Sequence, residues 1–389
     1  MQQDSIVIVG MARTPIGGLQ GSLAHLSASE LGAAAIRAAV ERAGVAPDAI
    51  DEVAMGNVLG AGQGQAPARQ AALKAGLPVS TACLTLNKMC GSGMKAVMLA
   101  HDQLRAGSAC IMAAGGMESM SRAPYLIARA RTGLRLGHGE LQDHMLLDGL
   151  EDAFDRGRLM GVFAEDCARR YGFDRQCQDA FALESLARAQ RAQNEGAFDR
   201  EIVPLDGAVP VLLDEQPLKA RPEKIPLLKP AFCADGTVTA ANSSSISDGA
   251  AALVLTTAAE AERRGLAPMA RIVGHATHAQ EPAWFSTAPV GAIGKLFAKT
   301  GWGVGDVDLF ELNEAFAVVA LAAMRELDLP RERLNVHGGA CALGHPIGAS
   351  GARILVTLIA ALQRHGGRRG VASLCIGGGE ATAMAIELV

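Results

Sequence analysis

The sequence predicts an α/β protein in which helices flank a parallel or mixed sheet, organised as two similar halves around an inserted region. The chain has 389 residues, more than one hydrophobic core usually holds, so two or three domains are expected. Hydrophobic residues make up 49% of the chain but aromatic residues only 4%, and the 45 glycines favour close helix–sheet contacts over a β-sandwich. Strand-like and helix-like patterns alternate toward both ends of the chain, which is typical of this fold class.

The first 120 residues alternate between apolar runs and helical periodicities. Residues 29–43 carry apolar side chains at a helical period, and Ser27 or Ser29 can serve as the N-cap. The expected strands are 6–9, 53–58, 84–86 and 109–114, and the expected helices are 29–43, 67–75 and 92–106. A glycine-rich turn is predicted at Gly115–Glu118, where the last of these strands ends.

The composition changes at Ser121, and from there to about residue 248 the chain is richer in charged and turn-forming residues. A charged helix pair is expected across 165–193, divided at Gly172. A solvated linker is the alternative, but this region contains large apolar side chains such as Phe163 and Phe181, and a solvated linker has few of these. We therefore predict an inserted domain, residues 121–248, that lies over the core sheets.

Alternating strands and helices return after Asp248. The expected strands are 250–255, 271–276, 309–312 and 371–375, and the expected helices are 258–264, 290–300, 314–326 and 348–364. The segments Gly91–Val97 and Ala349–Leu355 resemble each other, and each opens a helix that leads to a strand and a glycine-rich turn ending in Glu. This similarity between the two segments predicts an internal duplication. The first half would comprise residues 1–120 plus about 249–268, and the second half residues 269–389.

Charge and cysteine usage exclude several classes of protein. The 36 basic and 40 acidic residues give a net charge of −4, which does not favour nucleic acid or anionic membranes as partners. No apolar run approaches the ~18 residues of a membrane span, and the polar start Met1–Ser5 does not look like a secretory signal. None of the eight cysteines forms a Cys-x-x-Cys pair, so a zinc site is not expected from cysteine spacing. Several of them, such as Cys110 and Cys375, lie in apolar runs, and we expect reduced thiols in a cytoplasmic protein.

The most informative stretch is Leu86–Val97, in which Cys90 stands at a tight turn between a strand and a helix. Gly91 and Gly93 keep the backbone on either side of Ser92 free of Cβ atoms. A thiol at a helix N-terminus lies in a positive field, so the sequence predicts a lowered pKa for Cys90 and a nucleophilic role. A buried structural cysteine is the alternative.

Two further candidates lie in glycine-rich segments near the C-terminus. His345 precedes Pro346, which keeps it out of helical geometry and places it on a loop before a helix. An imidazole there can take the proton of a thiol, whereas the alternative is a histidine that only caps the loop. Cys375 ends a strand that enters Gly377–Gly379, whose backbone N–H groups can hold an oxyanion; a core thiol is the alternative. We expect these groups and Cys90 to converge where the two halves meet.

The remaining sequence patterns give weaker evidence for functional residues. Asn313 follows a strand and precedes a helix, where its side chain either caps that helix or holds a water or an oxyanion. No dinucleotide-binding fingerprint follows the first strand, and neither a Walker loop nor a serine nucleophile elbow is present. His275 and His278 are a weak candidate pair for a metal, because no carboxylate–histidine pattern accompanies them. We therefore expect no metal site.

Along its whole length the chain resembles the thiolase family, most closely bacterial acetyl-CoA acetyltransferases and related 3-ketoacyl-CoA thiolases. The matching motifs are Asn87–Gly93, Gly115–Ser121, Asn242–Ser244, Asn313–Phe316, Gly344–Gly351 and Cys375–Gly379. The resemblance implies a layered α-β-α-β-α core of two βαβαβαββ halves, with the inserted loop domain binding coenzyme A. It also implies a homotetramer, built as a dimer of dimers.

The resemblance assigns roles to the candidates. Cys90 is expected to carry the acyl group as a thioester, and His345 to take the Cys90 proton. Cys375 is expected to act as the acid and base at the carbon α to the thioester. Asn313 is expected to hold a water that forms one oxyanion site with His345, and the N–H groups of Cys90 and Gly377 the other.

The resemblance also implies the substrates. Ser244 is expected to contact the pantetheine arm of coenzyme A, together with Leu159 and Met160, which stand where acetoacetyl-specific members commonly have a His–Met pair. No cofactor is expected, because coenzyme A thioesters are the substrates. The expected function is acetyl-CoA C-acetyltransferase, acting in fatty acid metabolism. The alternatives are a 3-ketoacyl-CoA thiolase of broader chain range, a non-catalytic acyl-CoA-binding protein of this fold, and an acyl-carrier condensing enzyme, which a second reactive cysteine disfavours.

Overall fold

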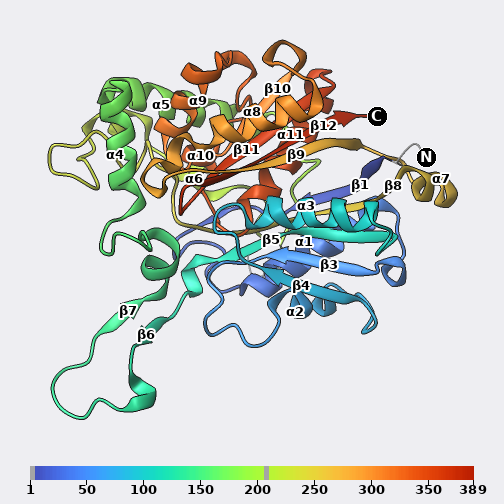
Figure 1. The fold of residues 1–389 in the computed structure, drawn as a ribbon, viewed down its shortest axis with the longest axis horizontal. Helices are drawn as coiled ribbons and strands as arrows, with labels where there is room; N and C mark the ends of the chain where they lie inside the picture. The colour runs from blue at the N-terminus through green and yellow to red at the C-terminus, as the bar shows by residue number, and fades with distance from the viewer. Residues whose placement is uncertain (1–4, 206–209) are drawn as a thin grey trace.

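The computed structural model describes residues 5–205 and 210–389 (Figure 1). Residues 1–4, which belong to the polar start, and residues 206–209 of the predicted inserted domain lie outside the described residues. Within the described chain the eight cysteines are free thiols. None of the described helices is both long enough and apolar enough to cross a membrane.

Ten strands form one sheet that divides into two half-sheets. The first half-sheet runs in the order β4 (Ala82–Leu86), β3 (Glu52–Gly56), β5 (Ile111–Ser119), β8 (Ser247–Thr257) and β1 (Ile6–Arg13), with the short β2 (Gly17–Gly18) beside β8. The second runs in the order β9 (Ala270–Ala279), β12 (Glu380–Leu388), β11 (Arg369–Ile376) and β10 (Leu309–Leu312). A short antiparallel pairing of β1 with β9 joins the two.

The two half-sheets repeat one pattern of pairing. In the first, β3 is parallel to β5, and β5 and β1 are each antiparallel to β8. In the second, β10 is parallel to β11, and β11 and β9 are each antiparallel to β12. Leu334 forms a parallel bridge to Phe310 in β10, at the place that β4 takes beside β3. The predicted pair of similar halves is confirmed by this topology.

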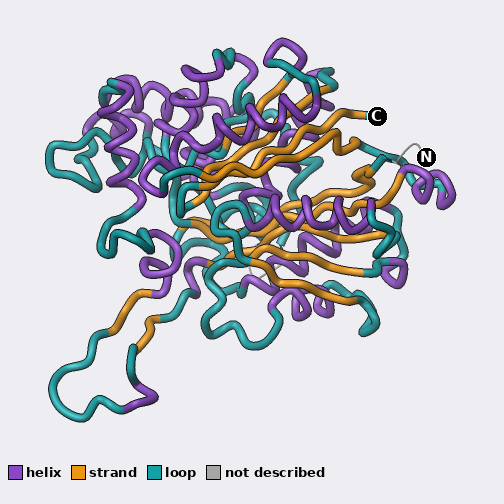
Figure 2. The backbone as a smooth tube through the Cα atoms, in the orientation of Figure 1, coloured by secondary structure: helices purple, strands orange, loops and turns teal. Residues whose placement is uncertain are grey.

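Helices form three layers around the half-sheets (Figure 2). Helices α1 (Ala28–Ala43) and α2 (Pro67–Lys74) cover the outer face of the first half-sheet. Helices α8 (Ala288–Thr300) and α9 (Ala317–Leu327) cover the outer face of the second. Between the half-sheets α3 (Ser92–Arg105) packs on α11 (Ser350–His365) in one shared core. This is the predicted α-β-α-β-α arrangement.

Local sequence explains where these helices begin and what they contact. Ser27 caps α1 and forms a reciprocal capping box with Glu30, and α1 ends at Gly44 in the left-handed conformation. In α11 the side chains from Ser350 through Leu362 are all buried, as expected for a helix that lies between two sheets. The α3–α11 layer therefore forms the centre of the molecule, and both helices begin close to candidate site residues.

The chain between β5 and β8 carries mostly helical and irregular structure. It contains the helices α4 (Met160–Tyr171), α5 (Arg175–Asn194) and α6 (Glu215–Lys219), a π-helical turn at Leu146–Leu150, and the hairpin of β6 (Tyr125–Ile127) and β7 (Leu141–Asp143). Figure 1 shows that this hairpin projects from the body of the molecule. In the second half, by contrast, only Gly377–Gly379 separates β11 from β12. The domain boundaries themselves stay a prediction.

Short helices complete the chain. They are α7 (Ala258–Arg264), α10 (Ala340–Leu343) and the 3-10 turns Pro47–Ala49, Met120–Arg122, Ala130–Thr132, Pro222–Leu227, Pro282–Thr287, Val304–Asp306 and Arg331–Arg333.

Two local predictions were wrong. The turn expected at Gly115–Glu118 is part of β5. Its glycines permit close packing: a Cβ at Gly115 would lie 2.0 Å from the Ala251 carbonyl O, and one at Gly116 would lie 2.0 Å from the Gly348 carbonyl O. The helix expected from residue 314 begins only at Ala317, because Phe316 is in an extended conformation and the Glu314 carboxylate accepts hydrogen bonds from the Ser185 and Asn335 side chains.

Candidate active site

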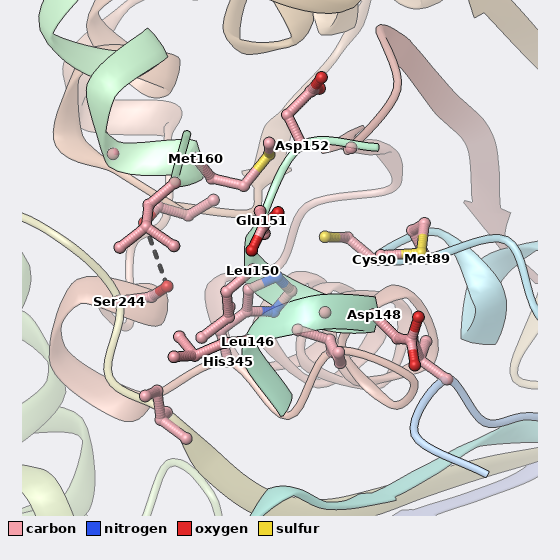
Figure 3. Close-up of a pocket in the computed structure, with 18 of the residues that line it drawn as sticks. Met89, Cys90, Leu146, Asp148, Leu150, Glu151, Asp152, Met160, Ser244 and His345 are labelled. Atoms are coloured by element: carbon pink, nitrogen blue, oxygen red, sulfur yellow. Dashed lines mark hydrogen bonds between the residues drawn. The ribbon is translucent and has the colours of Figure 1, made fainter. Parts of the chain in front are cut away.

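A pocket of about 860 Å³ opens where the two halves meet the inserted segment, and mostly apolar side chains line it (Figure 3). Six of the eight predicted site residues line this pocket: Cys90, Leu159, Met160, Ser244, His345 and Gly377. The other two, Asn313 and Cys375, are fully buried. Cys375 packs in the same apolar cluster as Phe316 and Met160, both of which line the pocket.

The turn that carries Cys90 is held by its own hydrogen bonds. Met89 has a φ of 45°, in the left-handed region that few residues with a side chain adopt. The backbone N–H of Ser92 donates to the Met89 carbonyl (3.0 Å), and the Ser92 hydroxyl accepts from the Lys88 N–H (2.8 Å). Figure 3 shows the Cys90 sulfur directed into the pocket, with His345, Met160 and Ser244 around the same space.

The first-half turn touches the second half directly. A Cβ at Gly91 would lie 2.3 Å from Cδ1 of Ile376, so a larger residue between Cys90 and α3 would displace that side chain. Ile376 is the last residue of β11, and Gly377 follows it. The two similar halves thus bring the turn that carries Cys90 into contact with the residue that precedes Gly377.

Burial raises the pKa of the Cys90 thiol to about 11. The backbone N–H groups of Gly377 and of Cys90 itself face the sulfur and favour the thiolate, but they do not outweigh its removal from water, and the charge of Glu118 opposes the thiolate further. The lowered pKa predicted from the helix N-terminus is therefore wrong for the free protein. At neutral pH the thiol is protonated and needs a base.

His345 has the form of such a base. Its Nδ1 lies 2.6 Å from the Ser350 hydroxyl oxygen, and that hydroxyl donates to the Pro346 carbonyl at 3.0 Å. With the hydroxyl donating to Pro346, Nδ1 carries the N–H and Nε2 the lone pair. Burial, with a contribution from Arg353, lowers the His345 pKa to about 3, so the ring is neutral at pH 7. Its Nε2 is buried and has no hydrogen-bond partner among the described residues.

Cys375 lies near the end of β11, as predicted, and is fully buried. Burial raises its pKa well above the ordinary thiol value, and a negative charge on Cys90 raises it further. The two sulfurs are thus close enough to influence each other's ionisation. The second thiol is a poor acid in the free protein and a strong base once its proton is removed.

Asn313 does not cap a helix. Helix α9 begins at Ala317 with Phe316 at the N-cap position, so the capping alternative is wrong. Both side-chain amide atoms of Asn313 are buried without a hydrogen-bond partner among the described residues. Leaving a buried amide unpaired is unfavourable by about 1–3 kcal/mol, so both of its polar atoms are available to hydrogen-bond a bound water or ligand.

The turn Gly377–Gly379 after β11 has backbone angles that favour glycine. Gly378 and Gly379 have φ values of 87° and 86°, where a side chain would be strained. A Cβ at Gly379 would also lie 2.4 Å from the carbonyl O of Gln280, whose N–H donates to the Gly379 carbonyl at 2.8 Å. The turn therefore depends on glycine, and it carries the Gly377 N–H that faces the Cys90 sulfur.

Ser244, Leu159 and Met160 surround another part of the pocket. The Ser244 hydroxyl donates to the Ala315 carbonyl at 3.0 Å (dashed in Figure 3), which leaves its oxygen able to accept. Leu159 stands at the N-cap position of α4 without a capping hydrogen bond, and Met160 begins that helix. Among the described residues other than its two chain neighbours, Met160 alone has an atom within 4 Å of a Cβ at Gly377: Sδ, at 3.7 Å.

Two polar residues near the site escaped the sequence reasoning. Glu118 is fully buried and accepts from the N–H groups of Val58 (3.0 Å) and Gly348 (3.0 Å), and burial raises its pKa to about 7. The sequence held one signal for Glu118: it is a single charged residue within an otherwise apolar strand. His144 lines the pocket with its Nδ1 2.6 Å from Asp148, a contact that their spacing of four residues could have indicated.

Known proteins resemble this chain over its whole length. Models of the thiolase N-terminal and C-terminal domains match residues 6–259 and 266–388. An acetyl-CoA acetyltransferase of Cupriavidus necator is 48% identical over 98% of this chain and 99% of its own length. The cytosolic acetyl-CoA acetyltransferase of Mus musculus is 48% identical over 99% of this chain and 98% of its own.

Solved structures of related proteins also resemble this chain over its whole length. The Acat5 thiolase of Ascaris suum, determined in complex with coenzyme A, is 42% identical with a TM-score of 0.95, and the match covers 99% of this chain and 100% of that one. The acetyl-CoA acetyltransferase of Bacillus anthracis is 41% identical with a TM-score of 0.96, covering 100% and 99%. The predicted fold and family are confirmed, and the chain belongs to the thiolase family.

Proposed function

We propose that this chain is an acetyl-CoA C-acetyltransferase that condenses two acetyl-CoA molecules to acetoacetyl-CoA and coenzyme A, reversibly, through an acyl group on Cys90. The observation that carries the proposal is one apolar pocket lined by Cys90, His345 and Gly377, with Cys375 buried beside it. The relatives that share the whole chain length are named as acetyl-CoA acetyltransferases.

In the first step Cys90 is acylated. His345 Nε2 takes the thiol proton, the sulfur attacks the thioester carbonyl, and the bond between that carbon and the coenzyme A sulfur breaks. The proton then passes from His345 to the leaving coenzyme A. A neutral imidazole with a free Nε2 suits this role, and so does a thiol with a pKa of about 11 that requires a base.

In the second step Cys375 acts on the next acetyl-CoA. Its thiolate, formed by transfer of its proton to His345, takes a proton from the carbon α to the thioester. The resulting carbanion attacks the acetyl carbonyl on Cys90, and Cys90 leaves as a thiolate that recovers the proton from His345. The strongly raised pKa of Cys375 supports this role, because a weakly acidic C–H bond needs a strong base.

Two oxyanion sites would stabilise the charge that develops in these steps. The backbone N–H groups of Cys90 and Gly377 face the Cys90 sulfur and suit the tetrahedral oxyanion of the acyl group. The buried, unpaired amide of Asn313 suits a bound water that, with His345, holds the thioester oxygen of the second substrate.

Ser244, Leu159 and Met160 are proposed to contact the coenzyme A thioester within the pocket. We further propose a cytoplasmic homotetramer, a dimer of dimers, that acts in fatty acid metabolism. The projecting hairpin supports assembly, because it exposes apolar side chains, among them Ile127 and Leu141 on its two strands. Light scattering of the purified protein measures the assembly directly.

Acetyl-CoA labelling followed by mass spectrometry tests the proposal. An acetyl group on Cys90 is the expected result, and a protein that binds acetyl-CoA without acetylation would be the non-catalytic alternative. Thiolysis rates with acetoacetyl-CoA and with longer 3-ketoacyl-CoAs then separate the acetyl-specific enzyme from a thiolase of broader range. This second measurement is needed because Leu159 stands where acetoacetyl-specific members have histidine.

A further inference from the structure

His101, Asp102 and His275 bring three donor atoms together away from the candidate active site. The Asp102 carboxylate Oδ1 lies 2.9 Å from His101 Nδ1 and 2.9 Å from His275 Nε2, and the two ring nitrogens are 3.3 Å apart. His101 and Asp102 belong to α3 in the first half, and His275 belongs to β9 in the second (Figure 1). The cluster therefore bridges the two halves.

The spacing of the three atoms matches that of metal ligands. A triangle with these sides has a circumradius of about 1.8 Å, which is shorter than the ~2.0–2.2 Å bonds of zinc to imidazole and carboxylate. One ion can therefore stand slightly above the plane of the triangle at bonding distance from all three atoms. Both ring nitrogens lie at hydrogen-bond distance from the same carboxylate oxygen, so an ion bound among the three atoms would take the place of the protons that they share.

The weak candidate pair from the sequence, His275 and His278, does not share one site in the structure. His275 and His278 are three apart on β9, and strand residues at odd spacing point to opposite faces of a sheet. His278 packs on Gly291 of α8 and contacts Gln280, whereas His275 faces α3. The carboxylate that the pair lacked in the sequence is supplied by Asp102, far away along the chain.

The surroundings favour a particular class of ion. Arg105 and Lys299 lie close enough to oppose positive charge on these imidazoles, and Lys299 Nζ is 3.2 Å from the His275 carbonyl. A hard cation such as Mg²⁺, which depends on electrostatic attraction, is therefore not favoured by the charges around this cluster. An ion that forms strong bonds to imidazole nitrogen gains from the ligands themselves.

We propose that His101, Asp102 and His275 form a binding site for a first-row transition metal ion of the Zn²⁺ class, which holds α3 of the first half against β9 of the second. Three protein ligands leave one position of a tetrahedral ion open to water. The site is separate from the thiol chemistry, so its role is to stabilise the contact between the halves. It does not rest on the proposed function.

Titration of the full-length protein with Zn²⁺ by calorimetry, and with Co²⁺ by absorption, tests the site. One ion per chain is expected, with Co²⁺ giving weak d–d bands and no thiolate-to-cobalt charge-transfer band, which separates this site from the eight free thiols. A hundredfold excess over Kd is expected to raise Tm by at least about 2 °C, because the ion binds the folded state. Mg²⁺ is expected to have no effect.

The variants are chosen to keep the fold. Asp102→Asn changes a half-exposed side chain, and His275→Gln keeps a polar group on the strand. Each is expected to weaken Zn²⁺ binding by at least tenfold, since even outer-shell partners contribute about 10–100-fold to metal affinity. His278→Gln, on the opposite face of the same strand, is the matched control and should bind as the unmodified chain does.

Absence of binding at micromolar Zn²⁺ would overturn the proposal and leave a hydrogen-bonded His–Asp–His triad. Binding that His275→Gln and Asp102→Asn leave unchanged would overturn it as well, because the ion would then be held elsewhere. These outcomes are independent of whether Cys90 becomes acetylated.

Discussion

Lys88 Nζ lies 2.7 Å from Glu380 Oε2, and this ion pair ties the turn that carries Cys90 to the end of the turn that carries Gly377. The two side chains are 19% and 32% exposed, so the pair contributes at most about 1 kcal/mol to the stability of the fold. Its effect is geometric. It joins the two turns whose N–H groups face the Cys90 sulfur, one from each half of the chain.

Glu380→Gln is expected to lower kcat for thiolysis of acetoacetyl-CoA on the order of tenfold while KM and Tm change little. The reason is that small displacements of groups at a reacting centre cost far more in rate than in stability. The paired reversal Lys88→Glu with Glu380→Lys restores the attraction and should recover most of the rate. If Glu380→Gln is as fast as the unmodified chain, the ion pair does not position the turns.

Cys90→Ser is expected to reduce turnover by at least about a thousandfold, because a hydroxyl is a much weaker nucleophile than a thiol paired with a base. The two side chains are nearly isosteric, so Tm should be unchanged. Steady-state thiolysis, with the mass of the protein after exposure to acetyl-CoA, checks both parts. Full activity in this variant would remove Cys90 from the mechanism.

Cys375→Ser is expected to separate the two steps. Acetylation of Cys90 by acetyl-CoA should persist, because His345 supplies the base for that step, whereas formation of acetoacetyl-CoA should fall by about a hundredfold or more. Rapid-quench mass analysis measures the first step and product formation the second. Loss of acetylation with condensation intact would contradict the assigned roles.

Ser350→Ala removes the hydroxyl that holds Nδ1 of His345, at 2.6 Å. We expect kcat to fall by about 10–100-fold and its pH profile to shift, because the ring loses the partner that fixes its tautomer. Ser373→Ala is the matched control: Ser373 is also fully buried, and its hydroxyl donates to the Thr382 carbonyl at 2.8 Å. If the two substitutions change kcat and its pH profile equally, Ser350 contributes only to the stability of the fold.

The pH dependence of Cys90 alkylation follows from its raised pKa of about 11. A raised thiol pKa means that the reactive thiolate forms only at higher pH, so the rate with iodoacetamide should rise about tenfold per unit from pH 7 to 10. A small free thiol levels off above its ordinary pKa of about 8.5 and provides the reference. A plateau below pH 8 would instead indicate a thiolate–imidazolium pair in the resting protein.

Local patterns predicted much of this molecule. The strand at 309–312 and the helices of the first half follow from short-range apolar periodicity and caps, which operate within a few residues. The turn at Cys90 and the loop at His345 were predicted for similar reasons, since glycine and proline restrict the backbone locally. Where the prediction was wrong, at Gly115–Glu118 and at the start of the helix expected from residue 314, the deciding contacts came from distant parts of the chain.

The sequence by itself determined which reactive residue types are present, on which turns they lie, and that the chain contains two similar halves. Only the tertiary structure decided their chemistry. The Cys90 pKa is raised because folding removes the sulfur from water, and the His345 tautomer is set by where the Ser350 hydroxyl proton goes. The meeting of Asp102 with His275 likewise depends on how α3 packs against β9. Solvation and contacts between distant segments are properties of the packed chain, and no window of neighbouring residues encodes them.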